Sequence, residues 1–175
     1  MKRFALILTL TAAPVMAFAA ANNTITFKGQ VSDQTCQVSI NGNAANPVVL
    51  LPTVSAAELN GVGSTAGETP FTIQVSGCTV PASDTPIQTA FLGNDVTSAG
   101  NMGNTGTAGN VQIQMLTGTA GTPVVLNGLT SVPGLVLPAA QSSASHDFAV
   151  RYISEAGGAA AGTVSASAVY ALDYL

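Results

Sequence analysis

Few side chains in this chain of 175 residues have the chemistry that catalysis requires. There are two cysteines, Cys36 and Cys78, and one histidine, His146, which precedes Asp147. With serines close by, this pair suggests a Ser-His-Asp triad. Adjacent residues of a strand point to opposite faces, however, so the two side chains would not pair as a triad requires. His146 is therefore expected in a loop before a strand at 148–153.

Metal sites and carboxylate pairs are equally poorly represented. One histidine excludes a His-rich zinc or copper site, and the acids do not have the spacing of a calcium loop. Nothing in the spacing of the eight Asp and Glu residues indicates the paired carboxylates of a glycosidase. An enzyme is disfavoured, and no cofactor is expected.

The first residues have the features of a secretory signal peptide over 1–21. Lys2 and Arg3 precede an apolar run, and small residues suit cleavage after Ala19 or Ala21. A membrane anchor is the disfavoured alternative, because the run is shorter than a span needs and contains Pro14.

Export gives the two cysteines a structural meaning. An even pair in an oxidising compartment predicts a disulfide between Cys36 and Cys78. In the chain-entropy model, closing this loop contributes on the order of 4 kcal/mol to the free energy of unfolding.

Removal of the signal peptide leaves two basic residues, Lys28 and Arg151, against eight acids, a net charge of −6. Nucleic-acid binding is excluded, since there is no basic patch. Charged residues make up 7% of the chain, against roughly 25% in an average soluble protein. This composition fits either a secreted protein rich in Ser, Thr and Asn or a subunit whose surface lies inside an assembly.

Two segments with an apolar side chain at every second position lie at the ends of the mature chain, and this period indicates β-strands with one buried face. The C-terminal face comprises Val164, Ala166, Ala168, Tyr170, Leu172 and Tyr174. The N-terminal face comprises Ile25, Phe27, Gly29 and Val31, with the polar Asn23 in phase. A long amphipathic strand at a chain terminus, where fraying is usual, suggests that something pairs with it.

Other short strands are expected between turn residues at 48–51, 71–76, 87–92, 111–116, 124–126 and 148–153. Asn41-Gly42 is a hairpin turn signal, and residues 55–59 suit a helical turn. Gly100, Gly103, Gly106 and Gly109 recur every third residue, which is interpreted as a flexible surface loop. Many short strands separated by Gly and Pro turns favour an all-β sandwich.

Several of these segments resemble motifs of chaperone–usher fimbrial subunits, with type 1 fimbrial major pilins the nearest likeness. Phe27-Lys28-Gly29 is similar to the family's N-terminal motif. Thr35–Val38 and 71–78 are similar to its two cysteine motifs, and Gly162 and Tyr174 frame the C-terminal strand as in the family. The segments at 90–93, 110–116 and 148–152 are similar to its central strands.

The resemblance implies an incomplete immunoglobulin-like β-sandwich, the pilin fold, completed by donor-strand exchange. Its expected plan is a signal peptide at 1–21, a donor extension at 22–33 and a pilin domain at 34–175. Donor positions would be Asn23, Ile25, Phe27, Gly29 and Val31. The chaperone-binding and acceptor strand would comprise Gly162, Val164, Ala166, Ala168, Tyr170, Leu172 and Tyr174.

The resemblance also implies the setting. Such a subunit is exported through the periplasm to the cell surface with a periplasmic chaperone and an outer-membrane usher as partners. There it polymerises with other fimbrial subunits and supports cell adhesion. A minor adaptor or tip-proximal subunit, a carbohydrate-binding adhesin, and an N-terminal strand folded back on its own groove remain alternatives.

Overall fold

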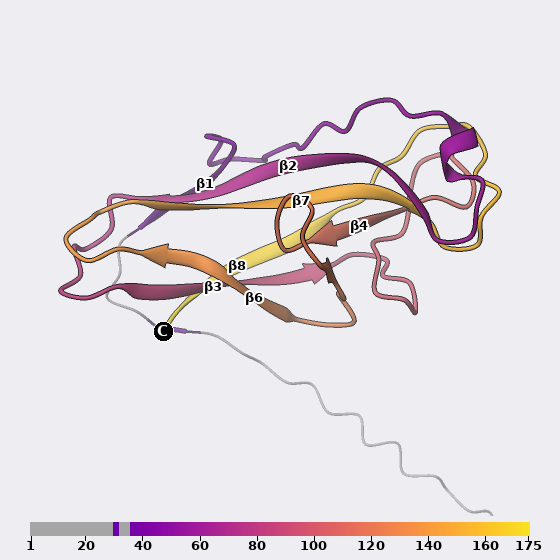
Figure 1. The fold of residues 1–175 in the computed structure, drawn as a ribbon. Coiled ribbons are helices and arrows are strands. Elements are labelled where there is room, and N and C mark those ends of the chain that lie inside the picture. The colour runs from indigo at the N-terminus through magenta and orange to yellow at the C-terminus, as the bar shows by residue number, and fades with distance from the viewer. Residues whose placement is uncertain (1–29, 32–35) are drawn as a thin grey trace, which may run out of the picture.

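The computed structural model describes residues 30–31 and 36–175, and within them the regular structure is almost entirely β-strand (Figure 1). The predicted signal peptide and the donor positions Asn23, Ile25, Phe27 and Gly29 lie outside the described residues. The strands are β1 (Gln37–Ile40), β2 (Ser64–Ser76), β3 (Thr85–Gly93), β4 (Gln112–Leu116), β5 (Pro123–Val124), β6 (Thr130–Leu137), β7 (Ala144–Ser154) and β8 (Ala168–Tyr174).

Two antiparallel sheets pack face to face as a sandwich, in agreement with the predicted fold class (Figure 1). The first has five strands in the order β1-β2-β7-β4-β5, and the second has three in the order β6-β3-β8. β7 is central in its sheet, whereas β8 is an edge strand that pairs only with β3. This difference determines where the sandwich is open.

Apolar side chains at alternate positions of the strands form the core. Phe71 on β2 stacks on Phe148 on β7 with ring centroids 5.7 Å apart. Phe91, on β3 of the other sheet, meets Phe148 edge to face at 5.2 Å. Phe148 is fully buried, so this aromatic cluster joins the two layers, with an edge-to-face pair that adds to simple burial.

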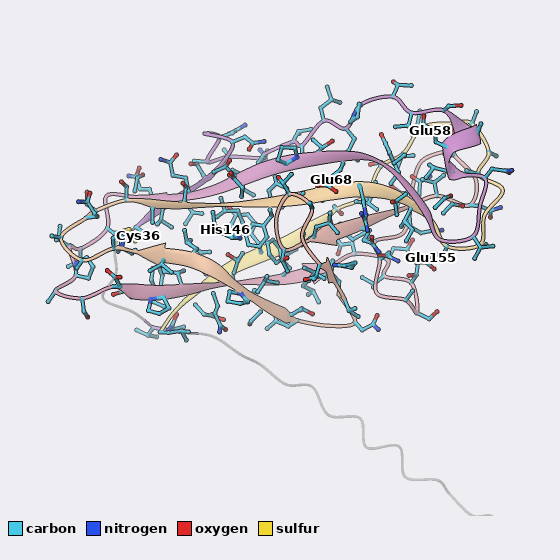
Figure 2. The ribbon with its side chains drawn as sticks, viewed as in Figure 1. Cys36, Glu58, Glu68, His146 and Glu155 are labelled. Atoms are coloured by element: carbon cyan, nitrogen blue, oxygen red, sulfur yellow. A yellow bond between two sulfur atoms is a disulfide. The ribbon has the colours of Figure 1, made fainter. Side chains whose placement is uncertain are left out.

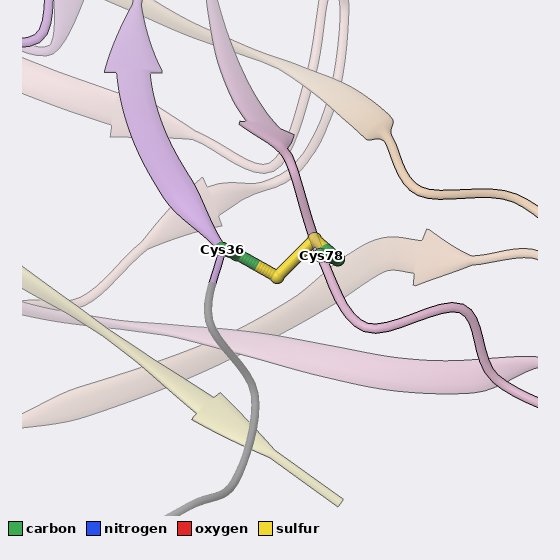
Figure 3. The surroundings of a disulfide bond; sticks show 2 residues. All are labelled: Cys36 and Cys78. Atoms are coloured by element: carbon green, nitrogen blue, oxygen red, sulfur yellow. A yellow bond between two sulfur atoms is a disulfide. The ribbon is translucent and has the colours of Figure 1, made fainter.

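The predicted disulfide is present (Figure 3). Cys36 lies immediately before β1, and Cys78 lies two residues after β2. These two strands are antiparallel neighbours, with Gln37 opposite Ser76. The bond therefore links the start of β1 to the end of β2, its neighbour in the sheet.

The turns predicted from the sequence are present in the structure. Asn41 and Gly42 both have positive φ, 49° and 76°, as a two-residue hairpin turn requires. Ile40 and Asn43 exchange backbone hydrogen bonds of 2.9 Å across this turn. The expected helical turn is the 3-10 helix η1 (Ala56–Leu59), which Ser55 and Glu58 cap reciprocally.

The structure differs from the sequence-based expectations at β6, at His146 and in the 100–109 segment. The strand β6, which contains Pro133 and Gly134, was not predicted, because these residues interrupt the apolar alternation. His146 lies within β7 opposite Ile73, not in a loop, because β7 begins earlier than predicted. The glycines of the 100–109 segment do not all lie on the surface, since Gly100 and Gly103 are buried.

Close packing explains the glycines of that segment. Gly100 and Gly103 are buried. A Cβ on Gly100 would lie 2.5 Å from a side-chain carbon of Val125, and one on Gly103 would lie 2.5 Å from the backbone oxygen of Asp95. These glycines therefore lie where neighbouring segments leave no room for a side chain.

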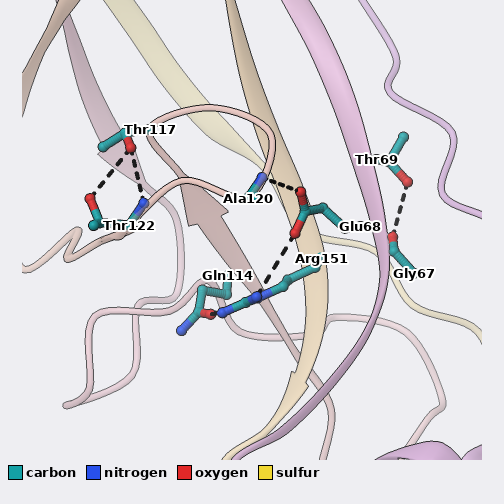
Figure 4. A network of polar contacts seen from close by, with 8 residues as sticks. All are labelled: Gly67, Glu68, Thr69, Gln114, Thr117, Ala120, Thr122 and Arg151. Carbon is teal, nitrogen blue, oxygen red and sulfur yellow. Dashed lines mark hydrogen bonds and ion pairs between the residues drawn. The ribbon is translucent and has the colours of Figure 1, made fainter.

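Polar contacts hold the outer face of the five-stranded sheet (Figure 4). Arg151 on β7 donates to Oε1 of Gln114 on β4 through Nε at 2.9 Å and Nη2 at 2.7 Å. Arg151 Nη1 lies 3.9 Å from Oε2 of Glu68, whose other carboxylate oxygen accepts the Ala120 amide at 2.6 Å. The network stiffens the sheet from the side opposite the core.

Candidate functional site

An apolar groove of about 730 Å³ runs along the sandwich between residues 47–51 and residues 164–170. Side chains from five strands and one loop line it: Ile40, Phe71, Phe91, Met102, Ile113, Met115, Val150 and Tyr152. All of these except Tyr152 belong to the buried core. The groove therefore opens the core of the sandwich directly toward its surroundings.

The first rim of the groove is the segment 47–51, between β1 and η1. Its side chains alternate as in a strand: Val49 and Leu51 pack against the core, whereas Val48 and Leu50 are 80% and 87% exposed. Within the described residues, no hydrogen bond joins the backbone of 48–51 to another segment. The expected strand is thus an extended segment without a partner.

The second rim is β8 together with the residues that lead into it. The predicted alternation is present, since Val164, Ala166, Ala168, Tyr170, Leu172 and Tyr174 are all half-buried. The first five pack against the main core cluster, and Tyr174 packs against the cluster beside the disulfide. The regular strand begins at Ala168, four residues later than predicted.

Hydrogen bonds show which backbone groups of the second rim face the groove. The carbonyls of Thr163, Ser165 and Ser167 accept from the amides of Ala108, Thr105 and Asn94, at 2.9, 2.9 and 3.0 Å. The Leu175 amide donates to Pro86 on the β3 side. Odd-numbered residues therefore bond away from the groove.

Because successive backbone groups of a strand alternate in direction, the even-numbered residues direct their amides and carbonyls to the open edge. From position 164 to position 172 these groups have no partner among the described residues. The groove therefore has an apolar floor bordered by two unpaired backbone edges. A single extended strand has the chemistry that such a space requires.

Gly162 marks the start of the second rim, and the structure gives a steric reason for this residue. A Cβ there would collide with the backbone of Thr107 and Ala108. On the other side of the same contact, a Cβ on Gly106 would collide with the carbonyl of Thr163. Two glycines thus allow the loop to dock against the chain just before β8.

Two tyrosines lie at the two rims. Tyr152 donates its hydroxyl proton to the Pro52 carbonyl at 3.1 Å, beside the first rim. Tyr174 ends β8 opposite Ile87. Burial raises the pKa of both phenols above the ordinary value of 10.0.

None of the described His, Asp and Glu residues lines the groove. Figure 2 shows Glu58 at η1, with Glu68, Glu155 and His146 on other parts of the sandwich. His146 Nε2 lies 3.1 Å from the Thr117 carbonyl, while Asp147 accepts from the Thr72 hydroxyl at 2.6 Å. No three His, Cys, Asp or Glu side chains among the described residues form a metal-binding group.

Two features at the N-terminal end of the described chain bear on the groove. Val31, predicted to be a donor position, is fully exposed. The side chain of Gln30 contacts the backbone of Tyr174. Sequence reasoning missed this contact because the two residues are 144 positions apart in the chain.

Comparison with known proteins identifies the kind of molecule. A family model described as fimbrial protein matches residues 25–175. The chain is 43% identical over 113 residues to the F17 fimbrial protein of Escherichia coli, covering 61% of this chain and 62% of that protein. It is 33% identical over 132 residues to the minor fimbrial subunit HifD of Haemophilus influenzae, covering 72% and 58%.

These matches span less than two thirds of the length of both relatives. Among solved structures, the P pilus rod subunit PapA has a similar fold, with a TM-score of 0.59 at 22% identity, covering 79% of this chain and 99% of that one. The described residues contain no helix long and apolar enough to cross a membrane.

Proposed function

The chain belongs to the fimbrial protein family, and from that premise we propose that it is a structural subunit of a bacterial surface fimbria. In this proposal an extended strand from a neighbouring subunit fills the groove between residues 47–51 and 164–172. One observation carries it: the even-numbered backbone groups of the second rim and the backbone of 48–51 face one apolar space without partners. An exposed edge of this kind aggregates unless something covers it.

The N-terminal segment is the proposed donor. Residues 22–33 form the extension and residues 34–175 the domain that accepts a strand from the next subunit. Ile25, Phe27 and Val31 would each contribute about 1.5–3 kcal/mol when fully buried, and Gly29 would pass a shallow part of the groove. Full exposure of Val31 in the single subunit supports this role, because a neighbour would bury it.

The proposal includes the route of assembly. The subunit is exported through the periplasm, where a chaperone covers the groove with a strand of its own, and an outer-membrane usher exchanges that strand for the donor. The filament then reaches the cell surface and supports adhesion. A purely structural subunit of this kind needs no catalytic residues.

A minor adaptor subunit is the second candidate, because the chain is similar to a minor fimbrial subunit over 72% of its length. Electron microscopy of cells lacking this protein distinguishes the two candidates. A shaft subunit predicts loss of the whole filament, whereas an adaptor predicts loss of the tip alone.

The donor role is tested by polymerisation of chaperone-bound subunits, followed as ladders on an unboiled denaturing gel. Deleting residues 22–31 should leave a protein that folds with its chaperone and accepts a donor peptide but cannot extend a filament past itself. Gly29→Leu should block extension, whereas the matched Gly29→Ala should retain much of it. Ladders of normal length from the deletion variant would show that the N-terminal segment is ordinary core.

A further inference from the structure

The side chain of Gln30 makes a two-point contact with the end of β8. The Tyr174 amide donates to Gln30 Oε1 at 2.9 Å, and Gln30 Nε2 donates to the Tyr174 carbonyl at 2.6 Å. A primary amide presents a donor and an acceptor side by side. The side chain therefore bonds both backbone groups of one residue, as a residue of an adjacent antiparallel strand does.

This contact lies on the open edge of β8. Tyr174 is even-numbered, so its amide and carbonyl continue the row that includes Tyr170 and Leu172, while the next amide bonds to β3. Gln30 thus takes the last position of the row. The positions before it stay available to an added strand.

The position of this contact matters because a strand added to this edge can pair in more than one register. Side chains of a strand alternate, so a slip by two residues keeps every apolar side chain on the groove side but moves it to the next site. In the donor segment such a slip would place Phe27 where Gly29 belongs. The correct register therefore needs a fixed end.

We propose that Gln30 is a register stop: its side-chain amide closes the edge of β8 at Tyr174 and confines an added strand to the positions before it. The inference rests on the proposed strand addition and specifies how that strand is aligned. It also places the C-terminal part of the subunit's own extension beside the closed end of its own groove, because Gln30 lies between the last two proposed donor positions, Gly29 and Val31.

The test compares the full mature chain with Gln30→Ala and Gln30→Glu. The second variant keeps the size of the side chain but replaces the amide donor by a carboxylate that faces the Tyr174 carbonyl. Gln141→Ala is the matched control, because Gln141 is an exposed glutamine whose backbone amide bonds to Pro138, away from β8. The probe is a peptide of residues 22–31 carrying a spin label near its N-terminus.

Two measurements are made by nuclear magnetic resonance. Without peptide, Gln30→Ala should exchange the Tyr174 amide hydrogen about tenfold faster than the wild type, because the acceptor of that hydrogen bond is lost, whereas Gln30→Glu keeps a carboxylate oxygen that can accept it. With peptide, the label should broaden one set of β8 amides in the wild type and in Gln141→Ala. In the Gln30 variants a second set, displaced by two residues, should also broaden.

Each result has a separate meaning. Unchanged exchange of the Tyr174 amide in Gln30→Ala, or one unchanged register with the peptide bound to both variants, overturns the proposed stop while strand addition stands. A peptide that binds none of the proteins overturns the proposed strand addition, and the stop with it.

Discussion

β7 and β8 present similar alternating faces to the core but end in different environments. β7 is paired on both sides, and Phe148 at its centre is fully buried. β8 is paired on one side only, and its inward side chains remain half-buried. Alternation therefore specifies which face of a strand is buried but not how many neighbours the strand has.

The two strands should therefore differ in what they contribute to the single subunit. In Phe148→Ala the free energy of unfolding should fall by about 3–5 kcal/mol, because a closed core retains the cavity. In Leu172→Ala it should fall by only about 1–2 kcal/mol, since that side chain is half-buried beside an open groove. Urea unfolding followed by circular dichroism measures both values.

Donor peptide then sharpens the difference. The loss of unfolding free energy caused by Leu172→Ala should increase when a strand covers the groove, while the loss caused by Phe148→Ala should stay the same. Equal costs for the two variants in the subunit alone would show that β8 is already enclosed, contrary to the comparison.

The approach to β8 should be more sensitive to an added methyl group than an open turn is. Gly162→Ala should destabilise the subunit by about 1–3 kcal/mol, because the new Cβ meets backbone that must shift. Gly61→Ala is the matched control, as its Cβ would find only ordinary contact at 3.9 Å. Thermal unfolding of both variants checks this, and a similar melting temperature for the two would contradict the close docking of 162 on 107–108.

The smallest effect concerns the tyrosines at the two rims. The pKa values of Tyr152 and Tyr174 are raised in the folded subunit by burial. An unfolded chain therefore loses these phenol protons first, so the contribution of the two phenols to stability is constant below a pH of about 10 and is lost as pH rises through the native pKa values. Tyr152→Phe and Tyr174→Phe should each remove part of that decline in urea titrations at alkaline pH. An unchanged decline in both would refute the assignment.

Sequence reasoning identified much of this molecule because local patterns dominate it. The sandwich, the disulfide, the hairpin at Asn41-Gly42 and the inward face of β8 were all predictable from alternation, cysteine pairing and turn residues. The strand β6 was not predicted because Pro133 and Gly134 interrupt its apolar alternation. The packing of Gly100 and Gly103 was not predicted because contacts between residues distant in sequence determine it.

The groove was predictable only in part. The apolar faces that line it could be predicted from the sequence, but the lack of partners for 48–51 and for the even-numbered edge of β8 is a property of topology. No window of sequence reports which strand stands beside which. The contact between Gln30 and Tyr174 was not predicted for the same reason, because it joins residues distant in the sequence.

The open edge of β8 is the central claim, and amide hydrogen exchange with and without the donor peptide tests it most directly. Peptide binding should protect the amides of Ala168, Tyr170 and Leu172, which face the groove. Those of Val169 and Ala171 should be little changed, because β3 already holds them. Protection that ignores this alternation, or protection of none of these amides by a bound peptide, would contradict the addition of a strand at this edge.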